Sequence, residues 1–315
     1  MQDAPNGFDT PMLGLKPAEW IEKLEEIAEE HGYYQPLGAH HHSTFVEDKP
    51  LLLVTFETIE SIQDRADTGQ PLGFELVREL GWSHLCILSE GQSWFRDPAV
   101  FAYFDRLVDD GFFDEFERVI FYGAGPGCAY AAATYSVCAP GATVVALQPQ
   151  ATLDPQLTGW DTRFRNMRKT SFTTRYGYAP DMTEAAEKVF ICYDPMERED
   201  AIHAALFRAE NTTLLPLPNM GDRLEDDFFE MQILFRLLAK AGKGELDARA
   251  AHRLFRARRT HVPYLDRLLL AIEKQKRPLL KAYLCANVVQ RLDAPRFRRK
   301  LELLENAASR GKLAG

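Results

Sequence analysis

The sequence has few cysteines, no long apolar run and no recognisable leader segment. Its apolar stretches fall short of the ~20 residues that a membrane-spanning helix needs. Its opening residues, MQDAPNGFDT, contain neither the basic nor the apolar segment of a signal peptide. The five cysteines are odd in number, scattered and free of any C-x-x-C spacing, which is typical of a reduced protein without a zinc site. These absences predict a soluble, cytoplasmic protein with no membrane span and no metal centre.

Charged residues are divided unevenly along the chain. Residues 1–244 contain 20 basic and 39 acidic side chains, whereas residues 245–315 contain 17 basic and 7 acidic ones. Two explanations of this basic tail are open. Either it binds a polyanionic partner or membrane surface, or its cations neutralise the acidic body and solvate its own helices. Because apolar residues are interleaved throughout the tail, we favour the second explanation and do not expect nucleic-acid binding.

Apolar segments rich in β-branched residues alternate with helical segments along most of the chain. We expect strands at residues 51–57, 83–90, 119–122, 143–150, 188–195 and 212–218. We expect helices at residues 17–31, 73–80, 197–210 and 224–241. This alternation predicts an α/β fold with a doubly wound, mostly parallel sheet. The histidine-rich residues 38–43, GAHHHS, are expected to form a solvated loop rather than a metal site.

From residue 243 onward the sequence predicts helices only. The expected helices, separated by prolines, are residues 247–258, 263–274, 278–291 and 295–309. The chain is therefore expected to have two regions, an α/β domain at residues 1–242 and a basic helical region at residues 243–315.

The most informative segment is residues 119–133, VIFYGAGPGCAYAAA. A short apolar strand is followed by three glycines at alternate positions and then by an alanine-rich helix. This arrangement serves either as the nucleophile elbow G-x-S-x-G or as the phosphate-binding turn G-x-G-x-x-G/A. The phosphate turn requires Gly or Ala where Cys128 stands, and an acidic residue at the end of the next strand, which holds Gln148 and Gln150. The dinucleotide motif is therefore incomplete.

The wider sequence resembles the α/β-hydrolases, particularly a bacterial branch found with polysaccharide and surface-glycan loci. In that branch the elbow reads approximately YGSSMGGYAA, the next strand ends in Pro-Gln followed by Asp-Pro, and a later strand ends in Tyr-Asp. The matching segments here are YGAGPGCAYAA, ALQPQATLDP and ICYDP, in the same order. The resemblance covers about residues 50–240 and implies an α/β-hydrolase fold with three catalytic positions.

Those catalytic positions are degenerate. The resemblance places the nucleophile at Gly125, the acid at Asp194 and the base at Asp222, where the family has histidine. The residue after the nucleophile normally donates its backbone N–H to the oxyanion, but Pro126 has no N–H. Because one oxyanion donor is worth ~3–4 kcal/mol of transition-state stabilisation, we expect no serine-hydrolase activity.

A binding pocket is expected to remain at the former active site. The residues expected around it are Gly123, Pro126, Gly127, Cys128, Trp160, Arg163 and Arg165. Cys128, in the first turn of a helix, is either a reactive thiol or a small buried residue, and we favour the second.

Two groups of charged residues near this pocket have open roles. The basic segment 160–180 occupies the place of a lid, and its cations either line an anion pocket or neutralise the acidic body. These cations are Arg163, Arg165, Arg168, Lys169 and Arg175. Asp194 either joins Asp200 and Asp222 in a cation-binding cluster or caps a helix that starts near Met196, which we favour.

The sequence thus favours a catalytically inactive relative of the hydrolases that acts as a binding or scaffolding module. We expect a small anionic or glycan-like ligand, a link to surface polysaccharide, no cofactor, and a protein partner at the basic C-terminal helices. The alternative is a nucleotide- or sulfonucleotide-binding oxidoreductase, of phosphoadenosine phosphosulfate reductase type, with its phosphates at residues 123–128. That chemistry needs a catalytic cysteine near the C-terminus, whereas Cys285 lies in an apolar segment with no neighbouring Gly or His.

Overall fold

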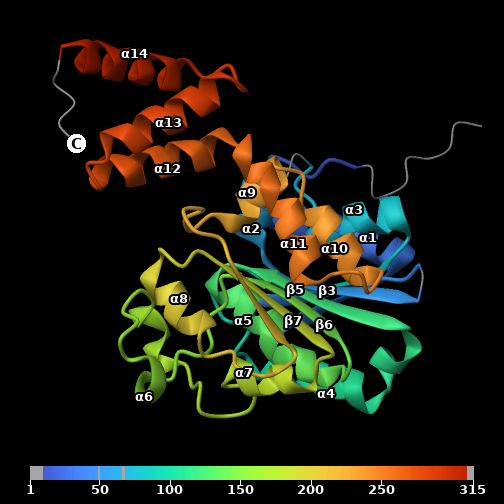
Figure 1. Cartoon of the computed structure of the whole chain (residues 1–315). Helices are drawn as coiled ribbons and strands as arrows, with labels where there is room; N and C mark the ends of the chain where they lie inside the picture. The colour runs from blue at the N-terminus through green and yellow to red at the C-terminus, as the bar shows by residue number, and fades with distance from the viewer. Residues whose placement is uncertain (1–9, 49, 66–67, 311–315) are drawn as a thin grey trace, which may run out of the picture.

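The computed structural model describes residues 10–48, 50–65 and 68–310. The prediction that the first residues form no signal peptide concerns residues 1–9, which lie outside the described residues. An eight-stranded sheet with helices on both faces forms the centre of the molecule (Figure 1). The strands are β1 Gly32–Leu37, β2 His41–Val46, β3 Leu51–Thr58, β4 Ser83–Ser89, β5 Arg118–Ala124, β6 Thr143–Leu147, β7 Lys188–Tyr193 and β8 Thr212–Pro216.

The strands lie in the order β1-β2-β4-β3-β5-β6-β7-β8. Strand β2 is antiparallel to both β1 and β4, and every other neighbouring pair is parallel. The predicted α/β class and mostly parallel sheet are therefore confirmed. All six predicted strands are present, with bounds that differ by a few residues.

The sequence did not predict the first two strands. The solvated loop expected at residues 38–43 holds for residues 38–40, which form an exposed turn, and is wrong for residues 41–43, because His41 begins β2. His41 and His42 are only 3% and 9% exposed. Strand β2 is paired along both edges, and rings cover both histidines: His41 contacts Phe95, and His42 stacks on Tyr34. Polar side chains with such partners give no apolar periodicity for a sequence to reveal.

Helices cover the two faces of the sheet through separate apolar clusters. On one face, α4 (Pro98–Asp109) and α5 (Pro126–Tyr135) pack against the central strands. On the other face lie α1 (Pro17–His31), α2 (Ile59–Arg65), α3 (Leu72–Leu80), α9 (Leu224–Glu230), α10 (Leu234–Gly242) and α11 (Ala248–Leu254) (Figure 1). The single helix expected at residues 224–241 is therefore two helices. The short helices α6 (Pro155–Thr158), α7 (Ala179–Met182) and α8 (Arg198–Ala204) follow β6 and β7.

The C-terminal helices α12 (Val262–Lys274), α13 (Pro278–Val289) and α14 (Pro295–Ser309) stack at one corner of the molecule, beyond the sheet (Figure 1). They share a small core of their own, whereas α11 packs in the same cluster as the sheet. His261 and Arg267 both bind the buried carboxylate of Asp227 in α9, with His261 Nε2 2.8 Å from Asp227 Oδ1. At this contact Arg267, from the basic C-terminal region, neutralises Asp227 of the acidic residues 1–244. Within the described ranges, every helix is too short or too polar to cross a bilayer.

Candidate functional site

The glycine turn forms a sharp elbow between β5 and α5. Gly125 has φ 77° and ψ 169°, a backbone conformation that favours glycine, and α5 begins at the next residue, Pro126. The Gly125 N–H donates to the carbonyl oxygen of Leu147 at 2.9 Å, which ties the turn to β6. The predicted strand, glycine turn and helix are confirmed.

Two consecutive residues of the elbow each lack one chemical group. Gly125 offers no side chain, although a Cβ built there would meet nothing within 4 Å. Pro126 offers no backbone N–H. A side chain at position 125 would therefore have open space around its first carbon.

A pocket of about 300 Å³ opens beside the elbow. Its lining comes from the C-terminal ends of three parallel strands, β3, β4 and β5, which is where ligands bind in open α/β sheets. The described lining residues are Thr58, Glu60, Ser61, Asp64, Gly91, Gln92, Ser93, Trp94, Phe95, Ala124, Gly125, Pro126, Gly127, Cys128 and Phe164. Among them are two carboxylates and three aromatic rings, but no lysine or arginine.

The ring of Trp94 packs against the elbow at Gly127. A Cβ on Gly127 would lie 3.4 Å from its ring, and Phe164 meets the ring edge-on at 4.8 Å between centroids. The indole N–H donates to Oε1 of Gln150 at 2.9 Å. Trp94 and Phe95 have φ values of 52° and 55°, which bulky residues rarely adopt. Such strain is commonest at functional sites, and no sequence signal pointed to this loop.

Asp194 is buried, and its carboxylate accepts three backbone hydrogen bonds. The donors are the N–H groups of Met196 at 2.8 Å, Asn219 at 3.1 Å and Gly221 at 2.6 Å. The expected helix cap is wrong, because α8 begins at Arg198 with Glu197 as its N-cap residue. Asp194 instead fastens the loop after β8, the loop that carries Asp222.

Asp222 itself is exposed. Gln148, at the end of β6, reaches the same loop: its side-chain oxygen accepts from the Leu224 N–H at 3.4 Å, and its nitrogen donates to Asp200 at 3.1 Å. Asp194, Asp222 and Asp200 all lie near Glu197, since burial and the charges of these three carboxylates raise the pKa of Glu197. Neither Asp194 nor Asp222 belongs to the described lining of the elbow pocket.

Arg163 is partly exposed and binds a network of buried polar side chains. It donates to Asp161 at 2.8 Å and to Asp200 at 2.6 Å, and Nε2 of the fully buried His203 lies 3.1 Å from the same Asp161 carboxylate. Burial alone would raise the pKa of Asp161, but the hydrogen bonds from His203 and Arg163 hold it well below its usual range. Nδ1 of His203 accepts the Ala151 N–H at 3.1 Å, so both ring nitrogens are engaged.

The other predicted pocket residues are divided. Pro126, Gly127 and Cys128 line the elbow pocket, while Gly123 lies in β5 below it. Trp160 packs on His203, and Arg165 is exposed. Arg175 pairs with Asp105, so it and Arg163 both neutralise acids of the body. The side chain of Arg168 lies outside the described part of the chain.

Cys128 is 9% exposed and is the third residue of α5. No histidine occurs among the described residues of the pocket that it lines. All five cysteines of the sequence are buried and none forms a disulfide. Cys128 is therefore a small, nearly buried residue, as the sequence analysis favoured.

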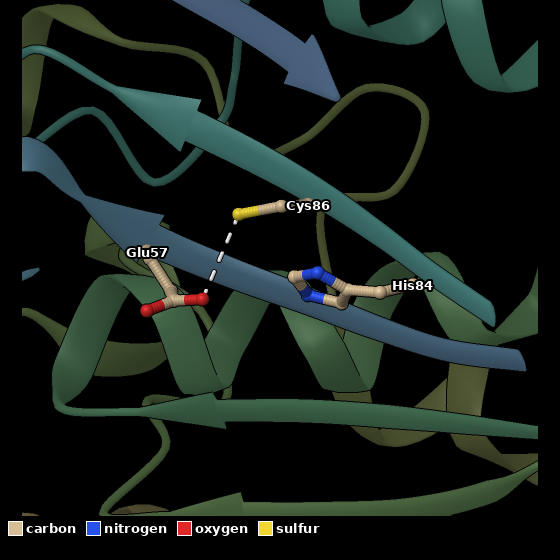
Figure 2. Close-up of side chains that lie close together, drawn as sticks. All are labelled: Glu57, His84 and Cys86. Atoms are coloured by element: carbon tan, nitrogen blue, oxygen red, sulfur yellow. Dashed lines mark hydrogen bonds between the residues drawn. The ribbon is translucent and has the colours of Figure 1, made fainter. Parts of the chain in front are cut away.

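A group of possible metal donors lies on the other face of the sheet. Figure 2 shows Glu57 from β3 beside His84 and Cys86 from β4, with one donor atom of each within 4.8 Å of the others. Thr55 Oγ1 already lies 2.8 Å from Glu57 and 2.9 Å from Nε2 of His84, and the Leu72 N–H donates to both oxygens of Glu57. Burial lowers the pKa of His84 to about 4, so the ring is neutral. This group stabilises the fold by tying α3 to the sheet. The alternating His-x-Cys of β4 was its only sequence signal.

No family model and no curated protein matches this sequence. Similar solved structures include the capsule O-acetyltransferase of Neisseria meningitidis serogroup A, at 10% identity, covering 64% of this chain and 93% of that one with a TM-score of 0.39. Another is the Glycosylation Associate Protein (Gap123) complex from Streptococcus agalactiae, at 12% identity, covering 64% of this chain and 44% of that one with a TM-score of 0.41. A third is an esterase of Pyrobaculum calidifontis, at 10% identity, covering 74% of this chain and 95% of that one with a TM-score of 0.42. At these identities and TM-scores, no property of those proteins is assigned to this chain.

Proposed function

We propose that this chain is a binding or scaffolding module of α/β-hydrolase type whose elbow is catalytically inactive. One observation supports this most directly. At Gly125 and Pro126 both the nucleophilic side chain and the oxyanion N–H are absent, yet a pocket of about 300 Å³ remains beside them. A site that keeps its cavity without its reactive groups is suited to binding.

The pocket lining favours an uncharged, glycan-like ligand over an anionic one. Glu60 and Asp64 accept hydrogen bonds from hydroxyl groups and repel anions. Phe164 supplies an apolar surface for the carbon skeleton of such a ligand. A link to surface polysaccharide agrees with this chemistry and rests on the sequence resemblance. The basic C-terminal helices remain the proposed contact for a protein partner.

The nucleotide alternative is less well supported by the same lining. A phosphate cradle uses backbone N–H groups at a helix N-terminus, and the first residue of α5 is Pro126, which has none. Two carboxylates and no described lysine or arginine line the pocket. Both features disfavour a pyrophosphate.

Thermal unfolding with a panel of ligands tests the proposal. Neutral oligosaccharides should raise the melting temperature, since a ligand at 100 times its Kd adds ~2.7 kcal/mol of stability. NAD(P), FAD and adenosine phosphosulfates should not. The double variant Glu60→Gln/Asp64→Asn should lose the shift, and Asp109→Asn, an exposed acid on α4, should retain it. A shift with nucleotides alone would overturn the proposal, as would a fluorophosphonate adduct on residues 119–133.

A further inference from the structure

A groove of about 670 Å³ lies between α12 and α13, two of the three stacked C-terminal helices (Figure 1). The lining residues of α12 share the spacing i, i+3, i+4 and i+7, which places them on one face of the helix: they are Leu268, Ala271, Ile272 and Gln275. The lining of α13 includes four residues with the same spacing: Leu280, Tyr283, Leu284 and Asn287. Two helix faces of this kind form the trough in which a third, amphipathic helix binds.

Helix α13 is more apolar than its burial requires. Of its 12 residues only Lys281 is charged, yet only Cys285 and Val288 are buried. Tyr283 and Leu279 are each 66% exposed. A helix that is apolar on all sides is normally buried, and tyrosine is enriched where proteins bind one another. The exposed side of α13 therefore lacks a partner among the described residues.

The charges of the groove are arranged around it and not in it. Its described lining contains no aspartate, glutamate, lysine or arginine. Exposed cations lie at both ends: Lys274, Lys276 and Arg277 at the turn between α12 and α13, and Arg291 beyond the far end of α13. None of these four cations forms an ion pair with a described carboxylate. An apolar trough with unpaired cations at its ends is complementary to an apolar helix face flanked by acids.

We propose that this groove binds an acidic amphipathic helix of a protein partner. The apolar face of that helix fills the trough, and its carboxylates lie against the flanking cations. A second copy of this chain fits less well, because residues 245–315 carry 17 basic and 7 acidic side chains and would repel the same region of another copy. A lipid bilayer fits less well too, because a flat surface leaves a concave hollow unfilled.

This docking role rests on the proposed function, in which the basic C-terminal helices contact a protein partner. It adds the place of contact and the chemistry of the partner. The groove and the elbow pocket share no described lining residue. Binding at one can therefore fail while binding at the other persists.

Titration of the full chain with two labelled model peptides, followed by fluorescence anisotropy, tests the inference. Both peptides are helices of about 20 Å, the length of α12, with leucines at i, i+3, i+4 and i+7. The other positions are mainly glutamate in one peptide and mainly lysine in the other. The glutamate peptide should bind, and its affinity should fall as the salt concentration rises from about 0.05 to about 0.5 M. The lysine peptide should not bind.

Two variants locate the binding in the groove. Tyr283→Ala should weaken binding of the glutamate peptide about tenfold or more, the scale of an interface hot spot. Leu303→Ala is its control, since Leu303 is 69% exposed on α14 and lies outside the described lining. Both side chains are exposed, and thermal unfolding checks that each variant folds.

The double variant Lys276→Glu/Arg277→Glu should also weaken binding and should remove most of its salt dependence. Arg299→Glu/Arg310→Glu, at two exposed positions outside the groove lining, makes the same change of net charge and should bind as the wild type does. An equal loss in both double variants would show that net charge and not the groove attracts the peptide, which would overturn the inference.

Four other results would overturn the inference. They are no binding of the glutamate peptide, equal affinity for both peptides, a dimer in sedimentation that Tyr283→Ala dissociates, and binding to phosphatidylserine vesicles that Tyr283→Ala abolishes. The last two would assign the groove to a second copy or to a membrane. None of these results alters the oligosaccharide test of the elbow pocket, and a negative oligosaccharide test leaves the groove in place.

Discussion

A Cβ on Gly123 would lie 2.2 Å from the carbonyl oxygen of Cys128, so strand β5 and helix α5 are in backbone contact across the elbow. The oxygen belongs to the main chain of a buried helix and cannot move aside as a side chain could. This contact places the first turn of α5, and with it Gly127 and Cys128, against the pocket.

Replacement of Gly123 by alanine should therefore destabilise the fold. We expect a loss of at least the ~1–3 kcal/mol typical of overpacked sites, measured by chemical denaturation. Gly91→Ala is the control, since a Cβ at Gly91 meets nothing within 4 Å. Equal stability of the two variants would show that α5 can shift away from β5 without cost.

Gly125→Ser should fold but should not create an active elbow. The new side chain has open space, and the cost is the backbone conformation of φ 77° and ψ 169°, which is essentially restricted to glycine and costs on the order of 1–3 kcal/mol for other residues. Pro126 still offers no N–H, and no described histidine lines the pocket. Turnover of p-nitrophenyl acetate should stay at the wild-type level. A rise of tenfold or more would mean that another group can serve as base for the elbow.

His84 should make the stability depend on pH. Burial holds its pKa at about 4 in the folded chain, against about 6.5 in an unfolded one. Between these values the unfolded chain binds a proton that the folded chain does not. The free energy of unfolding should therefore fall as the pH drops from 6.5 toward 4, by up to about 3 kcal/mol.

Urea denaturation at pH 7, 5.5 and 4.5 measures this effect. His84→Gln, whose amide can still reach Thr55, should flatten the decline over this range. His252→Gln, at an exposed position, should not. Identical pH profiles for wild type and His84→Gln would contradict the assignment of the titration to His84.

Asp161→Asn should weaken the network beside the elbow. Asp161 accepts from Arg163, Gln150 and His203, and the asparagine side chain can satisfy only part of this set. A loss of about 1.5–3 kcal/mol is expected for hydrogen bonds to a charged group, again by chemical denaturation. Asp181→Asn, an exposed acid in α7, is the control. A loss no greater than that of the control would indicate that water replaces the carboxylate.

The amino-acid sequence by itself determined the α/β class, six of the eight strands and the elbow. Apolar periodicity and glycine spacing are local properties, and they act within a single strand, turn or helix. The absence of a side chain at Gly125 and of a backbone N–H at Pro126 also follows from residue identity alone.

Only the tertiary structure decided which polar groups meet. His41 and Ser93 are 52 residues apart, and Arg163 and Asp200 are 37 apart. Their contacts depend on strand pairing and on the paths of loops, which no local pattern encodes. The same reason explains why β2 was missed: its histidines are buried because distant rings and hydroxyls satisfy them, and burial of that kind exists only once the chain has folded.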